Sequence, residues 1–469
     1  MKKTRHPAVL ATLATAAAAA AIAGGPRPAG AEEITVSIGH QSMTTATYPP
    51  GIIAEHLNLI QKYLPHSGKY RDVTYHLVWK DYASGPPITN MMLADKLDFG
   101  SMGDYPIITN GAKFQQTRSE RTLFIAVTGY NYRGSGEGVV VPLDSPIRSL
   151  QQLAGRMVSV PVGSDAWGML LKGLDDDHLG DRVQILNQSP AVGAANIAHD
   201  KIAAHADFDP WPELMEYRGY ARKIYDGSET GIPFIDGIVV RKAFADQYPE
   251  IVVAVCKAII AADDWVRKDP VAASRQLEQW SGIPREVQYL YLSQGGILTL
   301  DPTIKEPLVA ALQYDHGVLA RAKDVPPLDF KTWIDDRYIR EAYRELGLDY
   351  DTSVAAIDDP KIVNRNLPAQ IWVADEGIRD YQSIGAMLKA VAALRKAGTK
   401  INATYVYDGV VGVKLFGDTA YYATGANGIV KAFMREPDAQ TFARQAGGKA
   451  MTYGEAVSAW ATRAEVAKE

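Results

Sequence analysis

The stretch from Trp79 to Gly111 limits most strongly what this chain can fold into, because two turns in it each lead into a helix. It reads WKDYASGPPITNMMLADKLDFGSMGDYPIITNG. In the first turn, Ser84 is a residue type that caps helices. A proline after it fits the first helical position, where its missing N–H costs nothing. Apolar residues on one side of residues 88–96 then predict an amphipathic helix.

The second turn follows a short apolar run, residues 97–100, which predicts a buried strand. The strand ends at Gly103, Asp104 and Tyr105, and Pro106 opens the next helix. The start of each helix offers free backbone N–H groups and the positive end of the helix dipole. The stretch therefore predicts two helix N-termini that point into one crevice.

These motifs carry a family resemblance. A small residue before Gly-Pro-Pro, a helix and then LDFG-small-x-GDxP resemble the nitrate, sulfonate and taurine branch of the periplasmic solute-binding proteins of ABC transporters. The resemblance runs from about Glu33 to Gly347. It implies a two-lobed α/β type II periplasmic-binding fold with a hinge, a small-molecule ligand between the lobes, and a membrane permease with its ATPase as partners.

The first residues have the pattern of an export signal. Basic Lys2, Lys3 and Arg5 precede an alanine-rich apolar run, and Ala29-Gly30-Ala31 fits a small-x-small cleavage site, so residues 1–31 are predicted to be a signal peptide. The apolar run is short and weakly hydrophobic compared with the roughly 20 residues that span a bilayer. The single cysteine, Cys256, allows no internal disulfide and no lipid anchor at the cleavage site. We expect a soluble periplasmic protein with no membrane insertion.

Composition narrows the function further. The chain has 469 residues and a net charge of −5, which fits two or three globular domains and gives no indication of nucleic-acid binding. The sequence contains no GxSxG, P-loop or HExxH motif, so neither a catalytic residue nor a cofactor is predicted. We expect a monomeric binding protein rather than an enzyme.

Strands alternate with helices along most of the chain, which indicates an α/β fold with a largely parallel sheet. Two crossings between the lobes divide it. The predicted boundaries are residues 32–129 and 235–348 for lobe 1, 130–234 for lobe 2, 349–367 for a linker, and 368–469 for a small C-terminal α+β domain.

The C-terminal domain carries a second, weaker resemblance. Its run TFARQAGGKAMTYGEAVSAW is similar to the ending of the copper-accessory lipoprotein family of nitrous-oxide reductase. Cu(I) prefers sulfur ligands, but this domain offers no cysteine and only Met387, Met434 and Met451. The fold is expected to carry over, and no metal site is predicted.

Loops at the predicted strand ends supply the candidate ligand-binding residues. These are His40, Gln41, Ser42, Met43, Tyr82, Ser84, Gly85, Gly103, Asp104, Tyr105, Gly163, Ser164, Trp167, Asp207 and Asp209. In the family that the chain resembles, the turn at Gly163 and Ser164 and the run ending in Pro210 border the site. Ser164 either holds an oxyanion at a helix N-terminus or only caps the helix. Asp104 and Asp209 are either ligand contacts or a helix cap and a turn residue.

The acidic side chains among these candidates argue against a simple anion as the ligand. Sulfonate and nitrate need positive potential, yet Asp104, Asp165, Asp207, Asp209 and Glu213 are acidic, and only Lys80 is near in sequence. Helix N-termini for an anionic group and carboxylates for a cationic group suit a zwitterion such as an amino-sulfonate. The alternative is a metal ion held by His40 and carboxylate oxygens. The nine scattered histidines show no HxH spacing.

The predicted function is therefore the substrate-binding component of an ABC importer. It would capture a small polar organic anion or zwitterion (sulfonate-, taurine- or nitrate-like) by hinge closure and deliver it to the permease. The alternative is a periplasmic metal-handling protein that uses the cleft between the lobes, the C-terminal domain, or both.

Overall fold

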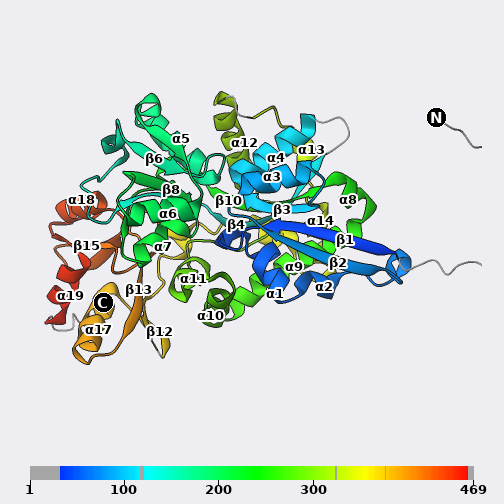
Figure 1. Ribbon diagram of the computed structural model, residues 1–469. Coiled ribbons are helices and arrows are strands. Elements are labelled where there is room, and N and C mark those ends of the chain that lie inside the picture. Colours follow the sequence, from blue (N-terminus) through cyan, green and yellow to red (C-terminus); the bar gives the residue numbers. More distant parts are fainter. Residues whose placement is uncertain (1–31, 117–120, 323–324, 375, 463–469) are drawn as a thin grey trace, which may run out of the picture.

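The computed structural model describes residues 32–116, 121–322, 325–374 and 376–462 (Figure 1). The predicted signal peptide, residues 1–31, lies outside the described residues. Within the described ranges, no helix has both the length and the apolar character that a bilayer crossing requires.

The first lobe is built on a mixed sheet with the strand order β2-β1-β3-β10-β4. Strand β1 runs parallel to β2 and β3, whereas β10 is antiparallel to its neighbours β3 and β4. The bounds are β1 Glu33–His40, β2 Thr74–Asp81, β3 Phe99–Gly103, β4 Thr122–Asn131 and β10 Phe234–Arg241. Figure 1 shows helices α3 (Gly85–Leu93) and α4 (Asp104–Gln116) on one side of this sheet and α9 (Pro249–Lys268) on the other.

The second lobe is built on a sheet with the order β7-β6-β8-β5-β9. Its strands are β5 Glu137–Pro142, β6 Met157–Val160, β7 Gln184–Asn187, β8 Ala204–Phe208 and β9 Ala221–Asp226, and its helices are α5 Asp165–Asp176, α6 Pro190–Ala198 and α7 Trp211–Tyr217. The chain enters this lobe between β4 and β5 and returns between β9 and β10. These two sheets and two crossings are the predicted two-lobed α/β architecture. The prediction of a largely parallel sheet is wrong, because the strand on which the chain crosses into each lobe pairs antiparallel with its neighbours.

Helices of the return segment cover the first lobe and lead to the C-terminal domain. They are α8 Lys242–Gln247, α10 Pro270–Ser281, α11 Arg285–Leu292, α12 Glu306–Arg321, α13 Phe330–Trp333 and α14 Arg337–Glu345. The segment predicted to be a loop-like linker, residues 349–367, contains two short helices, α15 Tyr350–Ala355 and α16 Pro360–Val363. Asp349 and Asp359 cap them by accepting backbone N–H bonds.

The C-terminal domain contains two small antiparallel sheets, with the orders β12-β11-β13-β14 and β16-β15-β17. Its elements are β11 Ala369–Val373, β12 Gly377–Tyr381, α17 Ile384–Lys396, β13 Ile401–Tyr407, β14 Lys414–Phe416, β15 Tyr421–Thr424, β16 Val430–Phe433, α18 Glu436–Ala446, β17 Ala450–Met451 and α19 Tyr453–Ala461. The predicted strands and helices of this domain are found, while β12 and β16 were not predicted.

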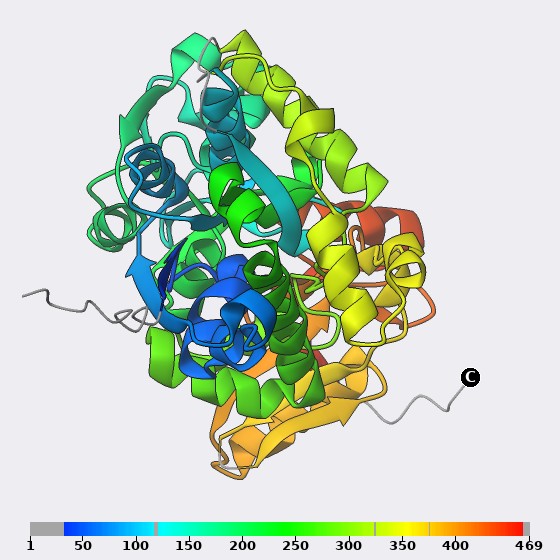
Figure 2. The ribbon, with the colours of Figure 1, turned by 90° about the vertical axis from the view of Figure 1, so that its right-hand side faces the viewer.

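This domain packs against both lobes (Figure 2). The Tyr405 hydroxyl donates to the carbonyl of Glu286 in α11 at 2.9 Å. The rings of Tyr289 and Trp372 meet edge to face, with centroids 5.4 Å apart. On the other lobe, Arg435 forms an ion pair with Glu229. Buried aromatic contacts of this kind make the domain part of the folded body, because they remove apolar surface from water.

Residues 49–63 do not form one continuous helix. The chain forms a π-helical turn (Pro49–Ile53), α1 (Ala54–His56) and α2 (Leu59–Tyr63). Gly51 has non-helical angles, φ −101° and ψ −114°, and Asn58 is left-handed with φ 52°. Asparagine tolerates that conformation better than most residues, so the chain turns at Asn58 instead of continuing the helix.

Candidate ligand-binding cleft

The two lobes touch at the loops that follow their strands. Asp209 comes after β8 in the second lobe, and its Oδ2 atom accepts a hydrogen bond from the backbone N–H of Ala46 at 2.8 Å and another from the Thr45 hydroxyl. Both partners lie in the short 3₁₀ helix Thr45–Thr47 of the first lobe. A Cβ added to Gly168 of α5 would fall 1.9 Å from the Tyr105 ring at the start of α4. The two lobes are therefore in direct contact at this point.

Three aspartates from both lobes converge at this contact, and we call them the carboxylate triad: Asp165, Asp209 and Asp236. One oxygen of each lies within 4.8 Å of the others, and all three residues are buried. Asp165 opens α5, and Asp236 lies on β10 opposite Gly103 of β3. A Cβ at Gly103 would lie 2.7 Å from Asp165 Oδ2 and 3.1 Å from Asp236 Oδ1. Glycine at this position thus leaves room for the carboxylates to approach.

No basic side chain in the described part of the chain forms an ion pair with these acids. Burial raises the pKa of Asp165 and of Asp236 well above its ordinary value, and neighbouring aspartates raise both further. Burial raises the pKa of Asp209 to about 7, although Thr45 and Ala46 donate hydrogen bonds to its carboxylate. Among the ion pairs of the described residues, none includes a member of the triad. Burial likewise raises the pKa of the nearby Glu137 well above its ordinary value, with Asp165 as the second cause.

The helix starts predicted to receive an anionic ligand face the chain's own carboxylates. Asp104 opens α4, and its Oδ1 atom accepts the N–H of Tyr105 at 2.6 Å. Burial raises the pKa of Asp165, and the backbone N–H groups of Asp165 and Ala166 act to lower it. Because an anion at a helix N-terminus depends on free N–H groups, part of the expected anion site is already in use.

The two predicted serine caps have different outcomes. Ser164 is buried and accepts the N–H of Trp167 at 3.3 Å, so the predicted cap of α5 is confirmed. Ser84 stands at the N-cap position of α3 but makes no side-chain hydrogen bond there, so that predicted cap is wrong. The α3 start is held instead by packing, since a Cβ at Gly85 would lie 2.4 Å from Pro106 Cγ.

The candidates after β1 form a separate polar group. Ser42 donates its N–H and its hydroxyl to the two oxygens of Asp81, each at 2.7 Å. The ring of His40 is buried, its Nδ1 atom has no hydrogen-bond partner, and burial lowers its pKa. Gln41 is buried. Met43 and Tyr82 are half-buried against the core.

Asp207 is occupied inside the second lobe. Its Oδ2 atom lies 2.8 Å from Nε2 of His205, and its Oδ1 atom accepts the N–H of Phe208 at 3.0 Å. His205 in turn lies 2.7 Å from the Ser159 hydroxyl. Asp207 is therefore a partnered core residue, whereas Asp209, two positions later, belongs to the triad.

Sequence reasoning missed Asp236 and Glu137. Glu137 begins β5, which is otherwise apolar and fully buried, and Asp236 lies in β10, which is otherwise apolar and buried except for Arg241 at its end. A carboxylate in such a strand is itself a signal, because a buried charge requires a partner. The signal was available in FIDGIVVR, which places Asp236 among apolar residues.

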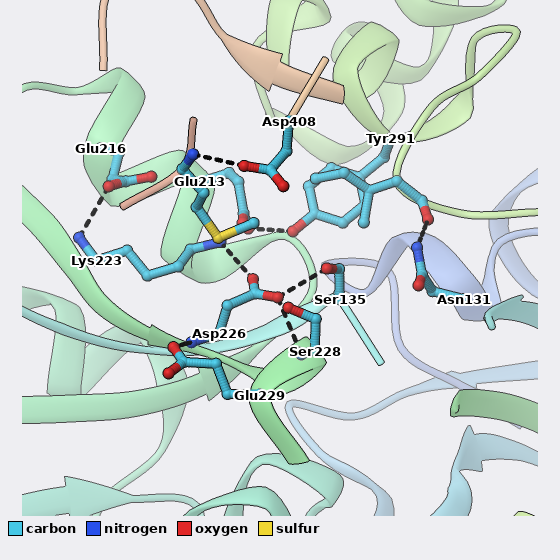
Figure 3. A network of polar contacts seen from close by, with 12 residues as sticks. Asn131, Ser135, Glu213, Glu216, Lys223, Asp226, Ser228, Glu229, Tyr291 and Asp408 are labelled. Carbon is cyan, nitrogen blue, oxygen red and sulfur yellow. Dashed lines mark hydrogen bonds and ion pairs between the residues drawn. The ribbon is translucent and has the colours of Figure 1, made fainter. Parts of the chain in front are cut away.

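A second buried acidic group lies on the side of the second lobe that faces α11 and the C-terminal domain, and we call it the lysine network (Figure 3). Lys223 forms ion pairs with Glu213 and, at 3.0 Å, with Asp226. Tyr291 of α11 donates its hydroxyl to Glu213, and Ser135 donates to Asp226 at 2.7 Å. Burial acts to lower the pKa of Lys223, but the carboxylates of Glu213 and Asp226 raise it above its ordinary value.

Comparisons with known proteins agree with this architecture. Residues 89–273 match the family described as NMT1/THI5 like. A protein of Escherichia coli (strain K12) named for binding aliphatic sulfonates is 24% identical over 285 residues, which are 58% of this chain and 83% of that protein. The taurine-binding periplasmic protein of the same organism is 31% identical over 222 residues, covering 44% of this chain and 64% of that protein.

A solved structure shares the fold. The alkanesulfonate-binding protein of Xanthomonas axonopodis pv. citri, bound to MOPS, superposes with a TM-score of 0.54 at 20% identity, over 65% of this chain and 99% of that chain. The C-terminal resemblance to a copper-accessory family finds no support in the comparisons. Residues 89–273 thus match the NMT1/THI5-like family, and the chain shares the two-lobed fold of a solved sulfonate-binding protein.

Proposed function

We propose that this protein is the substrate-binding component of an ABC importer and that it closes its two lobes on a small polar ligand. The observation that carries the proposal is the contact of Asp209 in the second lobe with Thr45 and Ala46 in the first. A ligand that contacts both lobes stabilises the closed form by its differential affinity for that form. Residues 130–234 would then move as one lobe about the crossings before β5 and after β9.

The proposed ligand carries a positively charged group. The relatives are named for binding sulfonates and taurine, but the carboxylates in this cleft repel a simple anion such as nitrate or an alkanesulfonate. Of the organic ligands expected from the sequence, a zwitterion fits best, with its cationic group toward the carboxylate triad. Its anionic group would then face Ser164 and the remaining N–H groups at the α5 start.

The remaining parts of the proposal follow from the relatives. They are periplasmic binding proteins rather than enzymes, so we propose export to the periplasm, no catalysis, and a permease with its ATPase as partners. Tyr105 and Trp167 are the proposed aromatic walls, since both are buried beside the contact between the lobes.

Small-angle scattering combined with thermal unfolding tests this function. The full chain, treated with EDTA, is measured with taurine, an alkanesulfonate, nitrate and calcium chloride in turn. A true ligand at a hundredfold excess over Kd stabilises the protein by about 2.7 kcal/mol, and it should also reduce the radius of gyration. If every probe leaves the radius of gyration unchanged, the receptor function is contradicted.

A further inference from the structure

We propose that the carboxylate triad, Asp165, Asp209 and Asp236, is a binding site for a hard metal cation of the Ca²⁺ class. The inference rests on the proposed receptor function, because the metal cation would occupy the place that the proposal gives to the positively charged group of the ligand. It differs from that function in naming the ligand's chemistry and the atoms that bind it.

The first argument is geometric. One oxygen of each aspartate lies within 4.8 Å of the other two. Calcium binds oxygens at about 2.3–2.6 Å, so two oxygens on opposite sides of one ion lie about that far apart. The triad thus encloses the space of a single ion.

The second argument is that carboxylate oxygens at this point have no partner. Both oxygens of Asp236 and the Oδ1 atom of Asp209 make no hydrogen bond, and the two residues are 0% exposed. Buried polar groups are hydrogen-bonded in the great majority of cases, and each exception requires an explanation. A bound cation would satisfy all of these oxygens at once.

A single buried aspartate without a hydrogen bond does not by itself indicate a metal site, and Asp263 of α9 is an example. Both of its oxygens also lack a hydrogen bond, and it is fully buried. However, Asp263 lies near Arg267, whose charge acts to lower its pKa, and it belongs to no group of three possible metal ligands among the described residues. The convergence of three carboxylates distinguishes the triad.

The chemistry of the donors selects the kind of ion. All three are carboxylates, with no histidine, cysteine or methionine among them. Oxygen-only sites favour Ca²⁺, Mg²⁺ and Mn²⁺ over copper or zinc. The larger coordination number of Ca²⁺ suits a site where further oxygens of Asp104 or Glu137, which interact electrostatically with the triad, lie in the neighbourhood.

The test is a titration of the EDTA-treated full chain with calcium chloride, followed by calorimetry. Terbium chloride serves as a second probe, because Trp167 lies two residues from Asp165 and would sensitise terbium luminescence. The variants are Asp236→Asn, which removes the ligand with two unpartnered oxygens, and the matched control Asp263→Asn, which makes the same change at a buried aspartate outside the triad.

We expect one equivalent of calcium to bind the wild type and the D263N variant with equal affinity. D236N should weaken binding by more than the roughly 10- to 100-fold that loss of an outer-shell partner costs. The proposal is overturned if the wild type binds neither calcium nor terbium, or if D236N and D263N bind alike.

The same samples separate this proposal from the receptor function. If taurine reduces the radius of gyration in EDTA while no metal binds, the metal site is overturned and the receptor function stands. If calcium binds in a manner that requires Asp236 and no probe closes the lobes, the metal site stands and the receptor function fails.

Discussion

The carboxylate triad and the lysine network both contain buried carboxylates, yet the charges of these carboxylates are balanced differently. In the network, Lys223 lies between Glu213 and Asp226, and hydroxyl groups complete the hydrogen bonding. In the triad, Asp236 has no hydrogen bond and no ion pair with any of the described residues. A buried carboxylate is costly unless it is paired, so the network is stable as it stands and the triad is incomplete.

This difference indicates a structural role for the lysine network and a ligand-binding role for the triad. The lysine network joins β9 and α7 of the second lobe to α11 through Tyr291, and it needs nothing from outside. The triad joins the same two lobes through carboxylates that repel one another. The lysine network therefore stabilises the fold. The carboxylate triad is where we propose that a cation binds.

The largest expected effect comes from breaking the network. Lys223→Met leaves Glu213 and Asp226 buried without their cation, which should lower the free energy of unfolding by about 3–5 kcal/mol. Urea unfolding measures the change. The control is Lys172→Met, which removes the i,i+4 pair with Asp176, an aspartate that is 48% exposed; a loss of about 0.3–0.5 kcal/mol is expected there. Equal losses in both variants would mean that Lys223 does not balance the network.

The fold followed from the sequence more fully than the cleft did. The apolar run of residues 97–100 predicted a buried strand where β3 is found, and the cap of α5 by Ser164 was also predicted. These are local patterns. The triad is not local, because β10 enters the first sheet between β3 and β4 and brings Asp236 opposite Gly103. Strand order is set by tertiary packing, and the hydrophobic pattern of a single strand does not reveal its neighbours.

The roles of the cleft residues could not be predicted from local sequence patterns either. Asp207 and Asp209 are two positions apart and looked equivalent in the sequence, but Asp207 bonds to His205 while Asp209 reaches Thr45. Residue type and spacing identified both as candidates, and only the three-dimensional neighbours distinguish them. The same holds for Ser164 and Ser84, of which only the first makes its predicted side-chain cap bond.

Among the described residues, Lys414 is a buried lysine without a carboxylate partner, just as Asp236 is a buried carboxylate without a basic partner. Lys414 of β14 donates to Ser293 Oγ at 2.6 Å and to the carbonyl of Gln294 at 3.1 Å, and burial lowers its pKa to about 7. An unfolded lysine keeps a pKa near 10.4, so between pH 7 and 10 the unfolded chain binds a proton that the folded chain lacks. Stability from this group therefore rises with pH in that window, by up to about 1.4 kcal/mol per pH unit, and is constant below it.

Lys414→Met removes that slope. The measurement is the difference in unfolding free energy between wild type and K414M at pH 7, 8 and 9. The difference should shift in favour of the wild type as the pH rises, because the burial penalty of the charged lysine disappears. A difference that stays constant across these three pH values would show that Lys414 remains charged when folded.

A smaller effect is expected from the hydrogen bond that ties the network to the first lobe. Tyr291→Phe removes the hydroxyl that donates to Glu213, and hydrogen bonds to charged groups contribute about 1.5–3 kcal/mol. The control in the same helix is Tyr289→Phe, whose hydroxyl donates to the uncharged Gln370 at 3.3 Å; about 0.5–1.5 kcal/mol is expected there. Thermal unfolding of both variants compares the losses. If Y289F costs more than Y291F, the charge of Glu213 does not strengthen its bond.

The smallest expected effect is an increase in the free energy of unfolding, whereas the substitutions in the lysine network decrease it. It compares an aspartate of the triad with an aspartate of the lysine network directly. Asp236→Asn in EDTA removes an unpartnered buried carboxylate but leaves a polar amide in its place, so the gain in unfolding free energy should be about 1 kcal/mol. The same substitution at Asp226 of the network removes a partner of Lys223, Ser135 and Ser228, and it should destabilise the protein. Urea unfolding at pH 7 measures both. If D236N stabilises the protein and D226N destabilises it, two equally buried aspartates differ because only Asp226 is paired with Lys223. If both variants are less stable than the wild type, the triad already stabilises the metal-free fold.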